Sequence, residues 1–183
     1  MRVAQGLAHL EIEPQPRVAQ VSAAELVHDM IFRITAETGD DARLHALMTE
    51  QVRRLTGFDR VMAYRFLPDD SGEVIAESLA EGVQSYLGLR YPASDIPPQA
   101  RALYLRNRVR VIADTDYRPV PIVPALNPDG TPLDLSRHGL RSVSPVHLEY
   151  MRNMGMAASM SISIIVNGRL CGLVACHHRT PRQ

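Results

Sequence analysis

Two short stretches of the sequence carry side chains that can recognise an acidic ligand. Residues 90–98 form a proline-bracketed turn that presents Asp95. Residues 141–147 offer an arginine, two serine hydroxyls and a histidine within seven positions. Guanidinium and hydroxyl groups donate hydrogen bonds to carboxylates, and a histidine can exchange a proton near neutral pH. The two stretches therefore predict a site for a ligand that has carboxylates and a protonatable polar centre.

Length and composition predict one globular domain. The chain has 183 residues, of which 45% are hydrophobic and 22% are charged, as in folded globular proteins. No apolar run approaches the ~20 residues that span a bilayer, which predicts no membrane segment. The N-terminus lacks the apolar core of a signal peptide, so we expect a cytoplasmic protein.

The charged residues exclude several function classes. The chain contains no lysine, so all 20 basic residues are arginines. Schiff-base catalysis and a lysine-dependent phosphate-binding loop are therefore excluded. A net charge of zero without a basic block argues against nucleic-acid binding. The two cysteines lie in one apolar segment and do not form a disulfide framework.

Apolar periodicity and turn residues predict an α+β domain with a mostly antiparallel sheet and helices packed on its faces. Asn167-Gly168 between two alternating runs predicts a tight hairpin, and residues 114–140 predict a long proline-rich loop. The expected strands are residues 7–13, 58–67, 73–79, 109–113, 158–166 and 169–177. The expected helices are residues 22–38, with Ser22 as N-cap, 41–55, 97–106 and 144–153, with Ser144 as N-cap.

The first two expected helices each carry one apolar stripe, which suits either the core or a dimer face. The strand at residues 7–13 has no evident partner and is interpreted as the tail of an upstream domain. The stripe residues are Leu26, Met30, Ile31 and Ile34 in the first helix, and Leu44, Leu47, Met48 and Val52 in the second.

The sequence contains five motifs in this order: residues 59–66, 72–77, 87–97, 150–155 and 172–178. Together they resemble the chromophore-binding GAF domain of bacterial phytochromes. The resemblance covers about residues 22–183, and residues 7–14 resemble the last strand of the PAS domain that precedes it. It implies an upstream tail at residues 1–18, a bilin-binding domain at residues 19–183, and a lasso-like loop after Asp114 that encloses the upstream segment.

This resemblance implies a linear tetrapyrrole ligand, biliverdin or a related bilin such as phycocyanobilin. Asp95 would contact the pyrrole N–H groups, with Ile96 and Pro97 in the same turn, while His147 would stack near the central rings and His177 would bind the ring D carbonyl. Tyr64, Tyr91 and Tyr150 would line the ring D cavity. Arg110 and Arg141 would pair with one propionate, and Ser144, Ser159, Ser161 and Tyr104 would satisfy the other.

Physical chemistry supports part of this assignment independently. Ser159 and Ser161 are two residues apart on a predicted strand, so both hydroxyls point to one face. Two carboxylates that enter a partly buried site need compensating charge and hydrogen-bond donors.

The attachment of the ligand is left open by the sequence. Position 146 is valine, where plant-type members carry the attachment cysteine, and bacterial members use a cysteine upstream of their PAS domain. The candidates in this chain are Cys171 and Cys176. We expect Cys171 to share a strand face with His177, about 20 Å away at ~3.3 Å per residue.

The resemblance implies an isolated or engineered photoreceptor fragment that is not an enzyme, works with PAS and PHY domains, and can fluoresce in the near infrared. The alternatives are a GAF sensor of cyclic nucleotides, and a homodimerisation module built on the N-terminal helices. Cys176 and His177 as nucleophile and base, or His177 and His178 as metal ligands, are disfavoured because neighbouring strand residues point to opposite faces.

Overall fold

The computed structural model describes residues 2–4, 7–13, 23–36 and 40–182. The main sheet has six antiparallel strands in the order β5-β4-β3-β8-β7-β6, with β3 and β8 at its centre. This confirms the predicted α+β fold. The strands are β3 (Arg60–Phe66), β4 (Gly72–Leu79), β5 (Arg90–Tyr91), β6 (Val109–Ile112), β7 (Ala158–Val166) and β8 (Arg169–His178).

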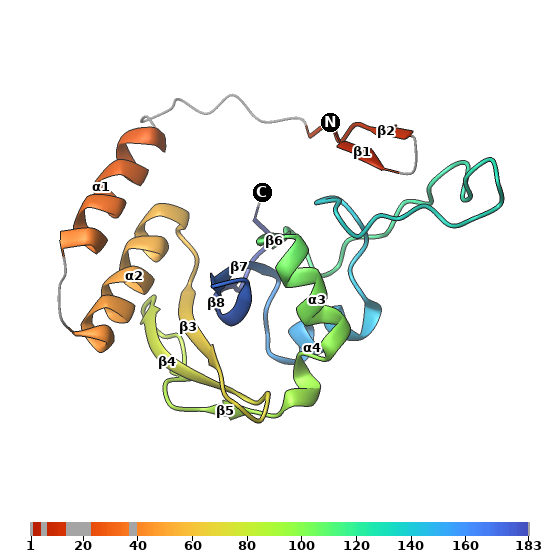
Figure 1. Cartoon of the computed structure of the whole chain (residues 1–183). Coiled ribbons are helices and arrows are strands. Elements are labelled where there is room, and N and C mark those ends of the chain that lie inside the picture. Colours follow the sequence, from red (N-terminus) through yellow and green to blue (C-terminus); the bar gives the residue numbers. More distant parts are fainter. Residues whose placement is uncertain (1, 5–6, 14–22, 37–39, 183) are drawn as a thin grey trace.

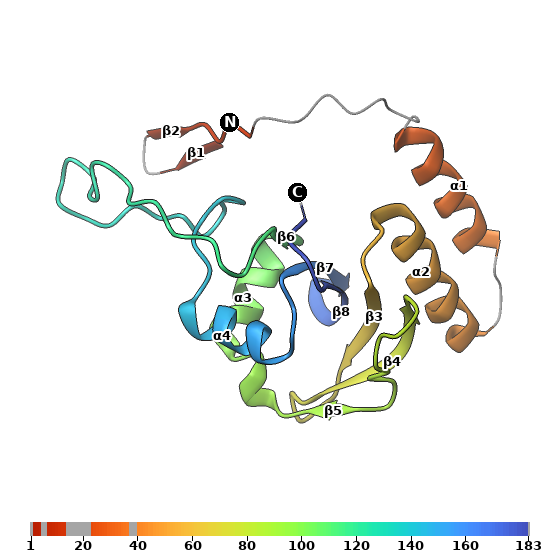
Figure 2. The ribbon, with the colours of Figure 1, turned by 180° about the vertical axis from the view of Figure 1, so that it is seen from behind.

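Helices cover the two faces of this sheet (Figures 1 and 2). On one side lie α1 (Ala23–Ala36) and α2 (Asp41–Thr56), and α2 packs against β3 and β4. On the other side lie α3 (Pro98–Arg106), which contacts β7 and β8, and α4 (Pro145–Asn153). The molecule therefore has three layers, with the sheet in the middle.

The side chains of the central strands alternate between the two helical layers. Val61 and Val174 are buried with Val52 of α2 in one cluster. Met62 follows Val61 in β3, and Leu173 precedes Val174 in β8. Both belong to a separate cluster on the opposite face. Because successive strand residues point to opposite sides, each central strand contributes to both clusters.

Local sequence signals set the ends of the elements. Asp40 caps α2, since its Oδ1 accepts a hydrogen bond from the Ala42 amide at 2.9 Å, and Gly57 ends the helix with φ of 67°. Asn167 and Gly168 both have positive φ and join β7 to β8, as the sequence predicts. Ser144 occupies the predicted N-cap position of α4, with Pro145 after it, but its side chain makes no capping hydrogen bond.

The N-terminal strand differs from its prediction. β2 (Leu7–His9) is only three residues long and pairs with β1 (Arg2–Ala4) in a separate two-stranded sheet. The expected partnerless strand over residues 7–13 is therefore wrong, because residues just upstream provide the partner. Leu10 and Ile12 are exposed beyond it. The predicted cap Ser22 lies outside the described residues.

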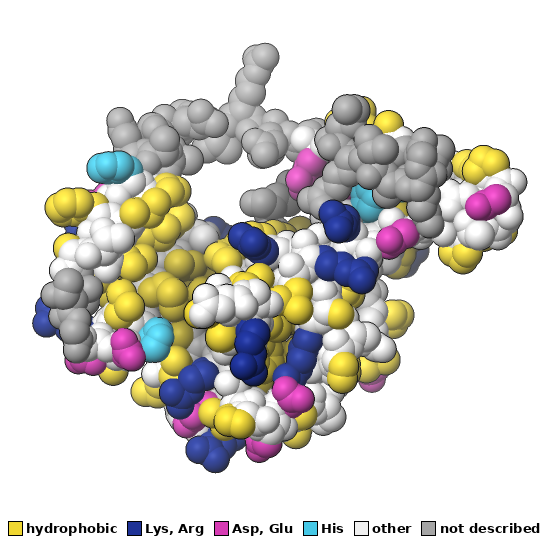
Figure 3. Space-filling model, viewed as in Figure 1, with side chains coloured by type: hydrophobic (Ala, Val, Ile, Leu, Met, Phe, Trp, Pro, Cys, Tyr) yellow, Lys and Arg dark blue, Asp and Glu magenta, His cyan; other side chains and the backbone are white. Residues whose placement is uncertain are grey.

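The apolar stripe of α1 is only partly covered. Met30 packs against the core cluster, whereas Ile31 is 53% exposed and Phe32 is 67% exposed. Of the two predicted roles of the stripe, Ile31 therefore does not take the core role, because α1 packs on α2 and the layer ends there. The side chain of Leu26 lies outside the described part. Apolar side chains gather over α1 and α2 on the face seen in Figure 3.

The segment between β6 and α4 contains no helix and no named strand, as predicted. It carries one isolated bridge between Leu126 and Pro132 and extends away from the sheet in Figure 1. Two short elements were not predicted: the edge strand β5 and the 3-10 helix η1 (Ala93–Asp95). Both lie in the turn that carries Asp95.

We expect the Gly172→Ala substitution to lower the melting temperature by several degrees. An added Cβ would lie 2.4 Å from the carbonyl oxygen of Tyr64 in the paired strand β3, so the backbone has to shift. Such overpacking costs about 1–3 kcal/mol. Gly139→Ala is the control, since its nearest contact is the Glu11 Oε1 at 3.9 Å. Equal melting temperatures for the two variants would contradict this account.

Candidate functional site

A cavity lies between the sheet and the layer formed by α3, α4 and the turn at η1. The space between its lining side chains, counted together with the adjoining open solvent, is about 820 Å³. The lining residues that the sequence predicted are Tyr64, Tyr91, Asp95, Ile96, Tyr104, Arg110, His147, Tyr150, Ser159, Ser161 and His177.

Six apolar residues that line the cavity were not predicted from the sequence. Strand alternation could have identified several of them, because Met62 shares a face with Tyr64, and Leu173 and Ala175 share a face with His177. The missed residues are Met62, Val74, Ile112, Met154, Leu173 and Ala175.

Three predicted site residues do not line the cavity. Pro97 occupies the N-cap position of α3, and Ser144 is exposed just before α4. Arg141 instead lines an adjacent hollow together with Arg110, which belongs to both. The cavity thus has a basic end, where Arg110 links it to this hollow.

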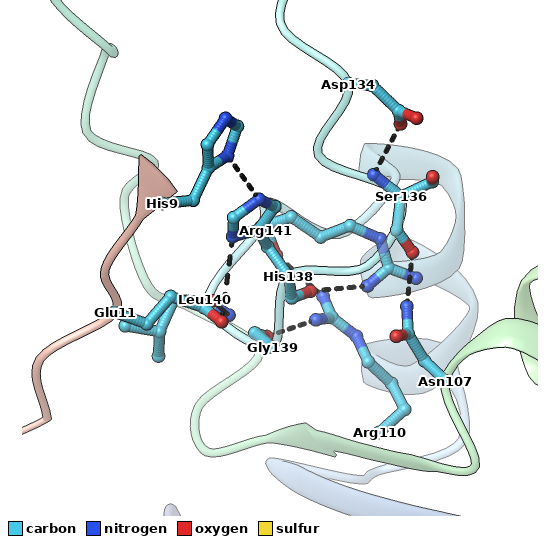
Figure 4. A network of polar contacts seen from close by, with 10 residues as sticks. All are labelled: His9, Glu11, Asn107, Arg110, Asp134, Ser136, His138, Gly139, Leu140 and Arg141. Carbon is cyan, nitrogen blue, oxygen red and sulfur yellow. Dashed lines mark hydrogen bonds and ion pairs between the residues drawn. The ribbon is translucent and has the colours of Figure 1, made fainter. Parts of the chain in front are cut away.

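The basic end is organised by the loop that precedes α4 (Figure 4). The Arg110 guanidinium donates to the carbonyl oxygens of Gly139 at 2.5 Å and Arg141 at 2.8 Å. Arg141 donates to the carbonyl oxygen of His138 at 3.4 Å. Burial, and then the charge of Arg141, lower the pKa of Arg110.

In the described part of the chain, Arg110 and Arg141 donate hydrogen bonds only to backbone carbonyl oxygens. Among the described residues, no carboxylate lies within ion-pair distance of Arg110 or Arg141. Desolvated positive charges are stabilised by an anion with good hydrogen-bond geometry. The arrangement therefore suits a carboxylate ligand.

The N-terminal segment holds the loop from outside. The His9 ring stacks on His138 with centroids 4.8 Å apart, and His9 Nδ1 lies 2.8 Å from His138 Nε2. Glu11 accepts a hydrogen bond from the Leu140 amide at 2.8 Å and lies 3.6 Å from His138 Nδ1. Residues 9–11 thereby stabilise the carbonyl groups that position Arg110 (Figure 4).

The opposite end of the cavity is aromatic. Tyr150 Oη donates to Asp95 Oδ2 at 3.3 Å, and the rings of Tyr64 and Tyr91 lie 6.0 Å apart. Burial and the Asp95 carboxylate raise the pKa values of Tyr64 and Tyr150 to about 12. These phenols are protonated at neutral pH and can donate hydrogen bonds.

Two histidines complete the polar part of the cavity. Burial, followed by the charges of Arg60 and His147, lowers the pKa of His177 to about 4. Burial and the charge of Arg110 lower the pKa of His147. At neutral pH His177 is therefore a neutral ring with one donor and one acceptor. Its buried Nδ1 has no hydrogen-bond partner among the described residues.

Neither cysteine reaches the cavity. Cys176 is fully buried with Val61 and Val174 on the opposite face of the sheet. Cys171 is exposed, and a register break leaves it without a partner in β7, because Ile165 pairs with Leu170 and Ile164 with Gly172. The expected shared face of Cys171 and His177 is wrong, since Leu170 packs on the cavity side instead.

Metal-binding clusters and membrane-spanning helices are both absent from the described part of the chain. No group of three or more histidine, cysteine, aspartate or glutamate side chains could hold a metal ion there. None of the described helices combines the length and the apolar character needed to cross a bilayer.

The two thiols should differ strongly in reactivity. In the native chain at pH 8 we expect an aromatic disulfide reagent to modify Cys171 within minutes and Cys176 only after unfolding. Burial raises the pKa of Cys176 to about 12, so its thiolate is scarce as well as inaccessible. Cys171→Ser should remove the fast reaction, while Cys176→Ser should leave it intact. Equal native rates for both thiols would contradict the placement of Cys176.

Comparison with known proteins identifies the fold family. The family model of the GAF domain matches residues 43–183. A bacteriophytochrome of Pseudomonas aeruginosa is 60% identical over 144 residues, which are 78% of this chain and 20% of that protein. A bacteriophytochrome of Xanthomonas campestris pv. campestris is 51% identical over 172 residues, covering 93% of this chain and 27% of that protein.

A comparison with solved structures agrees with these sequence matches. The chromophore-binding domain of the bacteriophytochrome RpBphP3 from R. palustris superposes with a TM-score of 0.83 at 50% identity, covering 87% of this chain and 54% of that chain. This chain thus spans about a fifth to a quarter of the length of these curated relatives. These matches show that the chain belongs to the GAF domain family and that bacteriophytochromes are among its relatives.

Proposed function

We propose that this domain binds biliverdin in the cavity and forms the light-sensing module of a red and far-red photoreceptor. The observation that carries the proposal is the polarity of the cavity. Arg110 lies at one end, next to Arg141 in the adjoining hollow, and neither has a carboxylate partner among the described residues, whereas neutral tyrosines and His177 lie at the other end. A linear tetrapyrrole has the matching order of groups, with propionates on its inner rings and a carbonyl on its terminal ring.

The propionates would be held by the chain's own donors. Arg110 and Arg141 would bind one propionate as a charge-assisted pair. Ser159 and Ser161 line the cavity from β7 and would donate their hydroxyls to the other. Ser144, which is exposed outside the cavity, would reach a propionate only if the loop before α4 moved inward.

The remaining polar groups would orient the conjugated part of the ligand. Asp95 would offer its backbone carbonyl to the pyrrole N–H groups, and His147 would share a proton with them through water. His177 would donate to the carbonyl of the terminal ring. A bound bilin supplies red absorption and isomerisation of the double bond between its last two rings. Tyr64, Tyr91 and Tyr150 would set the volume available around that terminal ring.

We propose that binding is non-covalent in this chain and that the domain is not an enzyme. Neither cysteine lines the cavity, and the buried Cys176 thiol faces the helical layer of α1 and α2. Within a longer photoreceptor, PAS and PHY domains would flank this domain. Near-infrared fluorescence would follow if the cavity restricts the bound pigment.

Exposed apolar residues of α1 favour one further role, self-association. Ile31 and Phe32 lie together on the uncovered side of the helix. We propose that a homodimer covers this side. Size-exclusion chromatography with and without biliverdin distinguishes a constitutive dimer from a ligand-dependent one.

Mixing the purified chain with biliverdin tests the proposed function. We expect a narrow far-red absorption band to appear on mixing, because a rigid polar cavity restricts and protonates the pigment. After denaturation in acid urea and gel filtration, the pigment should separate from the chain. Cyclic nucleotides should leave the melting temperature unchanged. The absence of a red band, together with stabilisation by a cyclic nucleotide, would overturn the proposal in favour of a nucleotide sensor.

Replacing His177 tests the role of the aromatic end. His177→Ala should shift or broaden the red band without abolishing binding, because one hydrogen bond to the terminal ring is lost while the propionate contacts remain. His178→Ala is the matched control, since the neighbouring ring points away from the cavity and lies 3.0 Å from Asp59. An unchanged spectrum of His177→Ala would refute this role.

A further inference from the structure

Strand β3 carries a buried arginine on the face of the sheet that bears the cavity, and most of its hydrogen-bond donors are unused. Arg60 is 2% exposed, and its Nη2 donates to the carbonyl oxygen of Gln84 at 2.6 Å. Its Nε and Nη1 are buried and have no partner among the described residues. His177 has the same deficit at Nδ1. Orphaned buried polar atoms are costly, so each needs an explanation.

These two side chains are direct neighbours across the sheet. Arg60 of β3 pairs with His177 of β8 in the antiparallel register. Directly opposed residues point to the same face, with Cβ atoms about 4.5–5.5 Å apart. The face is that of the cavity, since Met62 lines it two residues after Arg60, and Ala175 lines it two residues before His177.

The Arg60 guanidinium lacks an acidic partner. Its central carbon lies 3.6 Å from the centre of the Tyr86 ring, and no carboxylate in the described part of the chain lies within ion-pair distance. A protonated His177 beside it would place two cations in a desolvated site. His147 of α4 acts on His177 in the same direction as Arg60. The surroundings therefore favour a neutral His177 ring.

A neutral ring can satisfy both orphaned groups in only one tautomer. A guanidinium has donors and no acceptor, so a group that satisfies it has to accept. A neutral imidazole has one acceptor nitrogen, and the nitrogen that is buried without a partner is Nδ1. Placing the proton on Nε2 leaves Nδ1 free to accept from Arg60, directly or through one water.

We propose that Arg60 is a positioning residue that holds His177 in the neutral Nε2–H tautomer. In this state His177 presents a donor to the cavity and requires an acceptor, such as a carbonyl oxygen, at this end of the ligand. The inference deepens the proposed function and rests on it for the identity of that ligand group. The tautomer itself is a property of the chain without ligand.

Long-range ¹H–¹⁵N correlation spectra of the ligand-free chain, labelled at histidine, test the proposal directly. We expect the His177 ring to show one protonated and one unprotonated nitrogen at neutral pH, with the unprotonated nitrogen assigned to Nδ1. A ring protonated at Nδ1, or an imidazolium, would overturn the proposal in the unmodified protein, without any variant.

Variants test whether Arg60 is the cause. Arg60→Met should lower the ratio of the Nε2–H to the Nδ1–H tautomer by roughly tenfold, the effect of losing about one net hydrogen bond. Arg60→Lys keeps the charge and donors and should retain the original tautomer. Arg65→Met is the control on the same strand, because Arg65 is exposed and pairs with Glu73. An unchanged His177 tautomer in folded Arg60→Met would contradict the inference.

The outcomes separate this inference from the proposed function. The spectra use the chain without bilin, so a confirmed tautomer stands even if biliverdin fails to bind. Conversely, a far-red band on mixing together with an Nδ1–H tautomer would leave the proposed function in place and remove the role of Arg60. If Arg60→Met does not fold, the unmodified chain and Arg60→Lys still decide the question.

Discussion

Strand alternation in β3 and β8 is the constraint on which the rest of this structure depends. These strands lie at the centre of the sheet and contribute side chains to an apolar helical layer on one face and to a cavity with polar ends on the other. Because each successive side chain changes face, His177 points into the cavity while Cys176 and His178 point away from it. A shift of one residue in register would exchange the core for the site.

The second constraint is that the positive charge of the buried arginine side chains has to be compensated. All basic side chains are arginines, and three of them have no acidic partner in the described part of the chain. They are Arg60 on the cavity face of β3, Arg110 at the cavity and Arg141 in its adjoining hollow. Backbone carbonyls from the loop partly compensate Arg110, and the Tyr86 ring partly compensates Arg60. The loop keeps its position because His9 and Glu11 bind it from the N-terminal segment. The positive charge that remains uncompensated would bind the carboxylates of a dicarboxylate ligand.

Most of the fold and of the site could be predicted from the sequence, because the signals were local. Asn167-Gly168 determines a hairpin by backbone chemistry alone, and the two-residue spacing of Ser159 and Ser161 places both hydroxyls in the cavity. The failures needed non-local information. The bulge that removes Cys171 from the face of His177 depends on pairing with Ile164 and Ile165 across the hairpin.

Other features that the sequence did not determine have the same origin. Helical periodicity predicts the apolar stripe of α1 but not which of its residues the core covers, and Ile31 is exposed because the helical layer ends there. The short strand β2 pairs with β1, which lies upstream of it, and not with a strand of the main sheet. The importance of Arg60 could not be predicted from the sequence, because it depends on the cross-strand neighbour of Arg60 and on its unused hydrogen-bond donors. Such features depend on which residues meet, and periodicity describes only which face a residue occupies.

The most direct test of the central claim compares the affinity of the chain for biliverdin and for biliverdin dimethyl ester, measured by absorption titration at the same ionic strength. Esterification removes both negative charges and leaves the conjugated system intact. If Arg110 and Arg141 bind a propionate, the ester should bind about 100-fold more weakly, since two charge-assisted contacts are lost. Equal affinities would contradict the account, because the basic end of the cavity would then have no part in recognition.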